Sequence, residues 1–227
     1  MRTPSILPVF VLLLLVPTLA AAQDHAHHHA MAHPALPDGW MAPFDQPDAA
    51  HAAHMEEADD GLSFEIMEPG WHVTTGPSDI FYRHEFSAQD SYTLEAEIHL
   101  FDPGQRRESF GVFFGGSTLH DREEQGYGYF LVRRDGSYMI RERAGAEVLD
   151  VQGWTEHDAV PSWDDREAGA ETVAYRLAVE VGPEDVVFRV NDTEVDRRSR
   201  SALPADGHFG LRINHGLELH VSSVGVR

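Results

Sequence analysis

The sequence predicts an all-β fold, a β-sandwich behind a disordered N-terminal arm. Three observations predict it. Almost all of 61–227 consists of short runs in which apolar and polar residues alternate, the period of a half-buried strand. Gly, Asp and Asn separate these runs, as turns require. The length and spacing of the runs are those of a β-sandwich.

The first 22 residues have the pattern of a secretory signal peptide. Arg2 precedes the apolar run 6–16, and the small residues 20–22 supply a cleavage site. The apolar run is shorter than the roughly 20 residues that a membrane-spanning helix needs. We therefore expect a secreted or periplasmic protein without stable membrane insertion, whose domain begins at residue 61 and ends at residue 227.

The composition excludes some classes of partner. The chain has 38 acidic residues against 17 basic ones, all of them Arg, and a formal net charge of −21. Such a surface repels nucleic acid and anionic membranes. The absence of Cys excludes disulfides, so the domain depends on its core alone.

The segment 23–60 is expected to be a flexible arm. It is rich in Ala, His and Pro and has few residues that could form a core. Imidazole is the commonest ligand for Cu, Ni and Zn, so the arm is a candidate metal site, although it could equally be a solvated spacer. No cofactor is otherwise required. The candidate metal ligands are His25, His27, His28, His29, His33, His51 and His54.

The strands expected from the alternation follow one another from residue 62 to the C-terminus. They cover 62–67, 71–75, 80–86, 92–101, 110–115, 127–133, 138–143, 148–151, 173–181, 186–191, 194–197, 209–214 and 217–226.

Within the strand 92–101, alternation places Leu94, Ala96, Ile98 and Leu100 on the inner face. Between two strands, 134–137 contains an Asp-Gly pair and predicts a hairpin turn. The acidic interval 153–172 is expected to be a long loop, but it lacks the ligand spacing of a calcium site. The large apolar residues of several strands are expected in the core. They are Phe113, Phe130, Leu177, Val179, Phe188, Phe209, Leu211 and Ile213.

Seven segments together resemble the concanavalin A-like lectin/glucanase jelly rolls, and are similar to the bacterial 3-keto-disaccharide hydrolase-like domains among them. The resemblance implies two stacked antiparallel sheets, one of them concave, and a function in carbohydrate binding or glycoside chemistry. The segments that carry it are 70–76, 92–97, 110–116, 129–136, 175–179, 188–191 and 207–214.

A binding module for carbohydrate or another cell-envelope component is the function that we expect from this resemblance. The glucanase branch of the superfamily places its two catalytic acids in a Glu-x-Asp-x-x-Glu string, which the chain lacks. The nearest substitute is Glu95 with Glu97. The alternative is a glycoside hydrolase or lyase, in which Glu97 and His99 would be the acid/base groups.

The polar side chains of one sheet are the candidate ligand site. Arg, Asn, Tyr and Trp are the residue types that grip sugar hydroxyls and cover the apolar face of a sugar ring. Glu97, His99 and Trp163 are expected near them if the strands neighbour one another as in related jelly rolls. The alternative is cross-strand ion pairing on an exposed sheet. The candidate ligand-binding residues are Tyr129, Arg133, Arg141, Trp154, Arg212 and Asn214.

Overall fold

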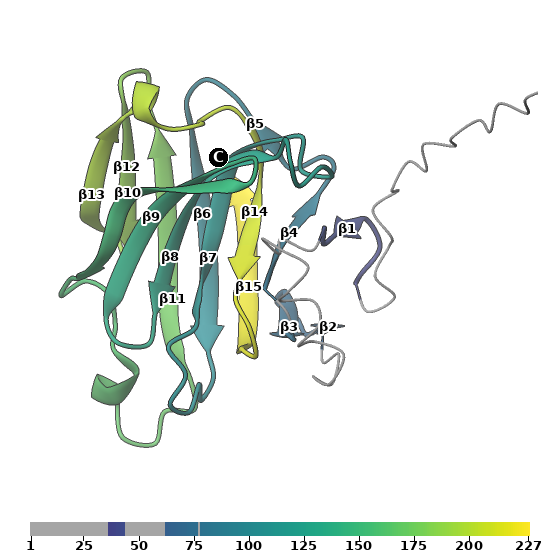
Figure 1. Ribbon diagram of the computed structural model, residues 1–227. Helices are drawn as coiled ribbons and strands as arrows, with labels where there is room; N and C mark the ends of the chain where they lie inside the picture. Colours follow the sequence, from purple (N-terminus) through teal and green to yellow (C-terminus); the bar gives the residue numbers. More distant parts are fainter. Residues whose placement is uncertain (1–35, 44–61, 77) are drawn as a thin grey trace, which may run out of the picture.

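The computed structural model describes residues 36–43, 62–76 and 78–227. Two antiparallel sheets stack face to face in it (Figure 1). Over the described ranges the only helices are two 3₁₀ turns, η1 (Trp163–Asp165) and η2 (Arg200–Ala202). No helix in these ranges is long and apolar enough to cross a membrane. The predicted all-β, two-sheet fold is confirmed.

The first sheet has eight strands, and Figure 1 shows those of its β7–β10 part curving along their length. In spatial order they are β1 (Trp40–Met41), β4 (Asp79–Arg83), β14 (Gly207–Ile213), β7 (Ser109–Ser117), β8 (Gly126–Arg133), β9 (Ser137–Ala144) and β10 (Glu147–Glu156), with β5 (Ser87–Ala88) paired to β14.

The second sheet has seven strands. In spatial order they are β13 (Thr193–Ser199), β12 (Asp185–Val190), β11 (Val173–Val181), β6 (Tyr92–Leu100), β15 (Glu218–Val226), β3 (Trp71–Thr74) and β2 (Ser63–Ile66). Long-range pairs join strands far apart in the sequence, such as β15 with both β6 and β3.

All the predicted strands form, with small shifts at their ends. The largest difference is β10, which runs to Glu156 and so takes in the first residues of the interval expected to be a loop. Its pairing with β9 is irregular between Asp150 and Gln152 and again between Gln152 and Thr155. Such bulges break the two-residue period, which is why alternation along the sequence does not reveal the end of this strand.

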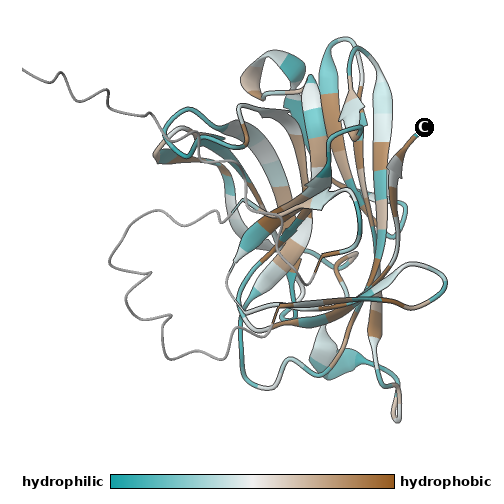
Figure 2. Cartoon of the chain, turned by 90° about the vertical axis from the view of Figure 1, so that its right-hand side faces the viewer, coloured by the Kyte–Doolittle hydropathy of each residue, from teal (hydrophilic) through white to brown (hydrophobic). Residues whose placement is uncertain are grey.

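The main core lies between the sheets. Leu94, Ala96, Ile98 and Leu100 of β6 are buried in it, as the alternation predicts. Figure 2 shows the same period as hydrophobic and hydrophilic positions that alternate along the strands. At the turn after β8, Gly136 has φ +79°, the conformation for which an Asp-Gly pair is suited.

Part of the expected flexible arm is packed on the sandwich. Residues 36–43 include β1, which pairs with β4, and the Trp40 side chain is only 4% exposed. Its ring lies 5.0 Å from that of Trp71 and 5.3 Å from that of Phe64, measured between centroids. The arm prediction is therefore wrong for 36–43, because one large aromatic ring is enough to hold a short segment against the core.

Candidate functional site

The outer surface of the eight-stranded sheet carries a second apolar cluster. Phe113, expected in the main core, belongs to this cluster instead, because it points away from its buried neighbours on β7. We call this surface the arginine–tyrosine face. Its arginines are Arg133, Arg141, Arg143 and Arg212, and its apolar cluster comprises Ile80, Tyr82, Phe113, Leu119, Tyr127, Tyr129, Leu131 and Met139, with Met41 and Trp154 packed against them.

A glycine makes room for the rings of this face. Gly210 of β14 lies opposite Phe113. A Cβ atom at Gly210 would stand 2.9 Å from the Phe113 ring and 2.2 Å from the Phe81 carbonyl oxygen, closer than packed carbon atoms come. The ring of Phe113 therefore occupies space that any side chain at position 210 would fill.

Arg212 lies over the tyrosines. Its guanidinium carbon is 4.7 Å from the centroid of the Tyr129 ring and 6.0 Å from that of Tyr127, within the range of cation–π attraction. Its Nη1 donates a hydrogen bond of 3.1 Å to the Tyr127 hydroxyl. Tyr129 is 3% exposed, so a ligand on this face would meet the arginine rather than the ring beneath it.

Arg133 forms a similar stack at the other end of the face. Its guanidinium carbon lies 4.0 Å from the centroid of the Trp154 ring. Its Nε donates to Asp135 and to the Ser137 hydroxyl, each at 2.9 Å. These contacts fix the guanidinium plane on the tryptophan, so that the group is already ordered before any ligand arrives.

Asp135 is the carboxylate that accepts a hydrogen bond from Arg133. Partial burial raises the pKa of Asp135, but hydrogen bonds from Ser137 and Arg133 and the nearby positive charges outweigh that effect. The net result is a pKa below the ordinary value. Asp135 therefore stays ionised and holds Arg133 in place over the whole neutral range.

Arg141 and Arg143 lie two residues apart on β9 and share the outer face. Arg141 pairs with Asp150 of β10. Arg143 is the more unusual group, because it is 4% exposed and its Nε is sealed from solvent without a hydrogen-bond partner among the described residues. Arg143 was not predicted as a site residue. Its alternation with Arg141 indicates the face on which it lies, but not its burial.

Asn214 directly follows the last residue of β14, and its side chain reaches Ser109 on the same face. Its Nδ2 donates a 2.9 Å hydrogen bond to the Ser109 hydroxyl. Its Oδ1 is buried and has no hydrogen-bond partner among the residues that the structure describes. An unsatisfied buried carbonyl is costly, so Oδ1 would gain from a hydrogen-bond donor that these residues do not supply.

All six candidate ligand-binding residues therefore lie on one face. The expected convergence with Glu97 and His99 is wrong, because β6 belongs to the other sheet. There, Glu97 Oε1 and His99 Nε2 are 3.2 Å apart on a partly exposed surface. Trp163 is also absent from the face, since it is buried in the main core beneath Arg166.

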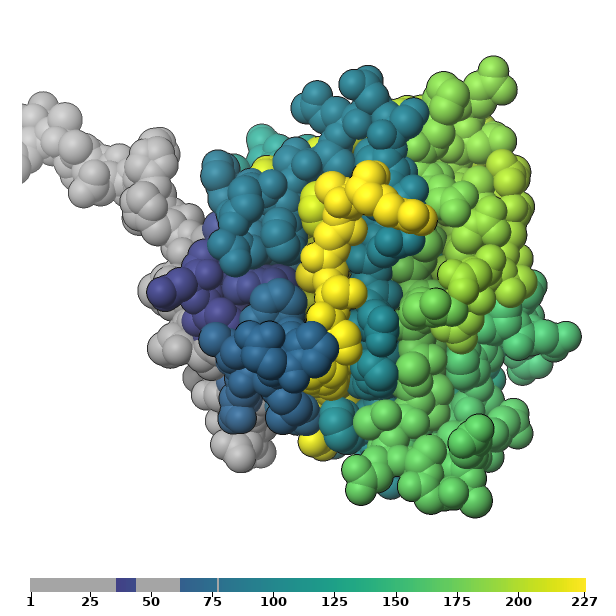
Figure 3. Space-filling view, turned by 180° about the vertical axis from the view of Figure 1, so that it is seen from behind, coloured from purple at the N-terminus to yellow at the C-terminus, as the bar shows by residue number. Residues whose placement is uncertain are grey.

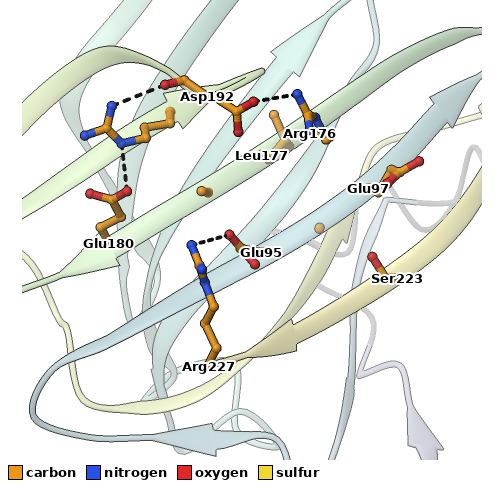
Figure 4. A pocket seen from close by; sticks show the side chains of 11 residues that line it. Glu95, Glu97, Arg176, Leu177, Glu180, Asp192, Ser223 and Arg227 are labelled. Atoms are coloured by element: carbon orange, nitrogen blue, oxygen red, sulfur yellow. Dashed lines mark hydrogen bonds and ion pairs between the residues drawn. The ribbon is translucent and has the colours of Figure 1, made fainter.

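The outer surface of the seven-stranded sheet, which we call the ion-pair face, is visible in Figure 3 around the yellow strand β15. A hollow of about 350 Å³ lies on it between β6, β11 and β15. Figure 4 shows how its charged side chains pair, with Arg227 on Glu95 at 2.9 Å and Arg176 on Asp192 at 2.6 Å. Because these groups already satisfy one another, the hollow is the weaker candidate for a ligand site.

The ion-pair face also carries a row of histidines that the sequence analysis missed. His220 of β15 lies directly beside His72 on one side and His99 on the other. Glu218 contacts His72 and Glu97 contacts His99. Within the described ranges, no three His, Asp or Glu side chains are placed so that they could hold a metal ion. The candidate metal ligands of the arm lie outside the described residues.

No known protein family matches the sequence, and no curated protein matches it. In structure, the chain is similar to the carbohydrate-binding module CBM66 from Bacillus subtilis, with a TM-score of 0.56 and 13% identity, over 83% of this chain and 95% of that one. The carbohydrate recognition domain of Emp46p, in its metal-free form, gives a TM-score of 0.51 at 11% identity, over 81% and 94% of the two chains.

A protein of unknown function with a galectin-like fold, also from Bacillus subtilis, gives a TM-score of 0.50 at 13% identity, over 82% of this chain and 93% of that one. These likenesses establish a concanavalin A-like, galectin-like jelly roll. The fold implied by the sequence resemblance is confirmed.

Proposed function

We propose that the chain is a non-catalytic carbohydrate-binding module, secreted or periplasmic, that binds a glycan of the cell envelope or its surroundings across the arginine–tyrosine face. One observation carries the proposal. Ordered guanidinium groups on aromatic rings, Arg133 on Trp154 and Arg212 on Tyr129, share a face with the unsatisfied carbonyl of Asn214. Planar donors and an amide acceptor are the groups that bind adjacent sugar hydroxyls.

Two further facts support the proposal. The structural neighbours include a carbohydrate-binding module and a carbohydrate recognition domain by name. Trp154 is only partly buried and the Arg133 side chain on its ring is 17% exposed, so part of this stack reaches the surface. An aromatic surface beside fixed polar groups is the usual composition of a sugar site.

The positions of Glu97 and His99 favour binding over hydrolysis. A retaining glycosidase needs two carboxyl groups about 5 to 5.5 Å apart in different environments. Glu95, the other acid on this strand, pairs with Arg227, and both Glu95 and Glu97 are partly exposed on the ion-pair face.

The test is glycan-array binding and affinity electrophoresis of the full chain and of two variants. Arg212→Ala should weaken glycan retention about tenfold, because it removes a charged hydrogen-bond donor. The matched control is Arg176→Ala, which removes an exposed arginine of the ion-pair face and should leave retention unchanged. Unchanged retention by Arg212→Ala would refute the site.

We also propose, from the sequence alone, that the arm binds copper, nickel or zinc, since seven of the 15 His lie between His25 and His54. Copper and nickel titration by calorimetry should give high-affinity uptake by the full chain. A variant with all seven of these His residues replaced by Gln should lose that uptake. Equal uptake by both proteins would refute metal binding by the arm.

A further inference from the structure

Arg143 is a buried cation that no acid among the described residues contacts in a recorded ion pair. The residue is 4% exposed, and its Nε is sealed from solvent with no hydrogen-bond partner in the part of the chain that the structure describes. Removing an unpaired charge from water costs several kcal/mol. Arg is almost never fully buried unless it is paired, so the position calls for an anion that the described residues do not supply.

The strand neighbours of Arg143 on this face offer no unpaired acid. The strand register places Tyr127 of β8 on one side and Val148 of β10 on the other. Neither carries a negative charge at neutral pH. The next acid along β10 on this face is Asp150, and it is already paired with Arg141. The acid of β10 on this face is therefore already committed to Arg141.

We infer that the glycan bound at the arginine–tyrosine face is acidic, and that a carboxylate or sulfate group on one of its sugars pairs with the Arg143 guanidinium. This inference rests on the proposed function and specifies its ligand class. The planar guanidinium presents parallel N–H donors that match the two oxygens of such a group. Pairing also removes the cost of the uncompensated charge, so ligand binding and relief of that cost occur together.

The net charge of −21 opposes an acidic glycan at long range, so the pairing with Arg143 must act at short range. At physiological ionic strength charges are screened beyond about 8 Å, so the acidic surface elsewhere does not prevent contact at Arg143. It does oppose any acidic polymer that cannot reach this group. We expect a polyanion without sugars, such as poly-glutamate, to bind poorly.

The test compares the full chain with Arg143→Met, which has similar length and no charge. Five probes are used: alginate and polygalacturonate oligosaccharides for carboxylates, carrageenan oligosaccharides for sulfates, and laminarin and levan as neutral glycans. The unaltered chain should bind at least one acidic probe, and Arg143→Met should bind it at least about tenfold more weakly. The acidic probe that binds identifies the anionic group. Arg176→Met on the ion-pair face is the matched control and should bind normally.

Thermal unfolding provides a second, independent measurement. Because Arg143→Met removes a buried unpaired charge, its melting temperature without ligand should equal or exceed that of the unaltered chain. The acidic probe should raise the melting temperature of the unaltered chain and not that of the variant. A variant that melts lower, or that binds the acidic probe as well as before, would overturn the inference.

The outcomes separate the inference from the proposed function. If only laminarin or levan binds, and Arg212→Ala weakens it, the face binds carbohydrate and the acidic ligand class is wrong. If no glycan binds at all, both the proposed function and the inference fail.

Discussion

The two outer faces of the sandwich contain the same kinds of charged residue and use them differently. On the ion-pair face, arginines extend into solvent and pair with acids, as Arg176 does with Asp192 and Arg227 with Glu95. On the arginine–tyrosine face, Arg212 lies over Tyr129 and Arg143 is buried. An antiparallel sheet normally has one dry face and one wet one, and the eight-stranded sheet departs from this pattern.

The difference shows that exposure, and not residue type, separates a surface network from a candidate site. Exposed ion pairs contribute little because water and salt screen them. A guanidinium held over a buried ring has lost most of its hydration already, so it gains more from a ligand and loses less order on binding. The same residue type is therefore a solubilising group on one face and a recognition group on the other.

The largest expected effect concerns the apolar layer under the arginines. Phe113→Ala should lower the free energy of unfolding by about 3 to 5 kcal/mol, as for a core aromatic residue, because Phe113 is fully buried although it lies outside the main core. The control is Leu149→Ala at an exposed position of β10, which should cost less than about 0.5 kcal/mol. Urea unfolding measures both, and a small effect at Phe113 would show that this layer is not a second core.

A smaller effect is expected at Asp135. Its folded-state pKa is lowered, so its contribution to stability is present above the unfolded-state pKa of about 3.9 and is lost as the pH falls through the folded value. Asp135→Asn should lower the unfolding free energy by about 1 kcal/mol at pH 7. Denaturant titrations from pH 7 to pH 2 should show this gap closing as the pH falls below the unfolded-state pKa and through the lower folded-state value. A gap that is constant with pH would contradict the ion pair with Arg133.

The smallest effect is expected on the ion-pair face. Glu180 Oε1 accepts a 2.7 Å hydrogen bond from Arg189, and both side chains are partly exposed. Glu180→Gln should change the unfolding free energy by less than about 1 kcal/mol and should leave glycan binding unaltered. A larger loss of stability, or any loss of binding, would remove the distinction between the two faces.

Much of the fold could be predicted from the sequence because successive side chains of a strand point to opposite faces, which gives a half-buried strand a two-residue hydrophobic period. The inner residues of β6 and the hairpin turn at Gly136 follow directly from that period and from turn chemistry. The period fails where both faces of a strand are buried. In β7 every residue from Ser109 to Gly116 is buried, so the side on which Phe113 lies cannot be read from the pattern.

The candidate site could be predicted only in part, because alternation shows the face of a strand on which a residue lies but not which strands are neighbours. Alternation within β8 and β9 places Arg133 and Arg141 on one face, and the sequence shows this. It does not show that β6, with Glu97 and His99, lies in the opposite sheet, since pairing between distant strands leaves no local signal. Arg143 was missed because nothing in its sequence neighbourhood indicates that its side chain is buried without an acid.

The sequence by itself determined which segments are strands, where the chain turns, and that two antiparallel sheets must enclose an aliphatic and aromatic core, because these depend on local periodicity and backbone preference. Only the tertiary structure decided which strands are neighbours, which arginine side chains are buried, and which of them form ion pairs with Asp or Glu. Those outcomes depend on contacts between residues far apart in the sequence, such as Arg212 with Tyr127, which are 85 positions apart. Such contacts form only when the sheets are assembled.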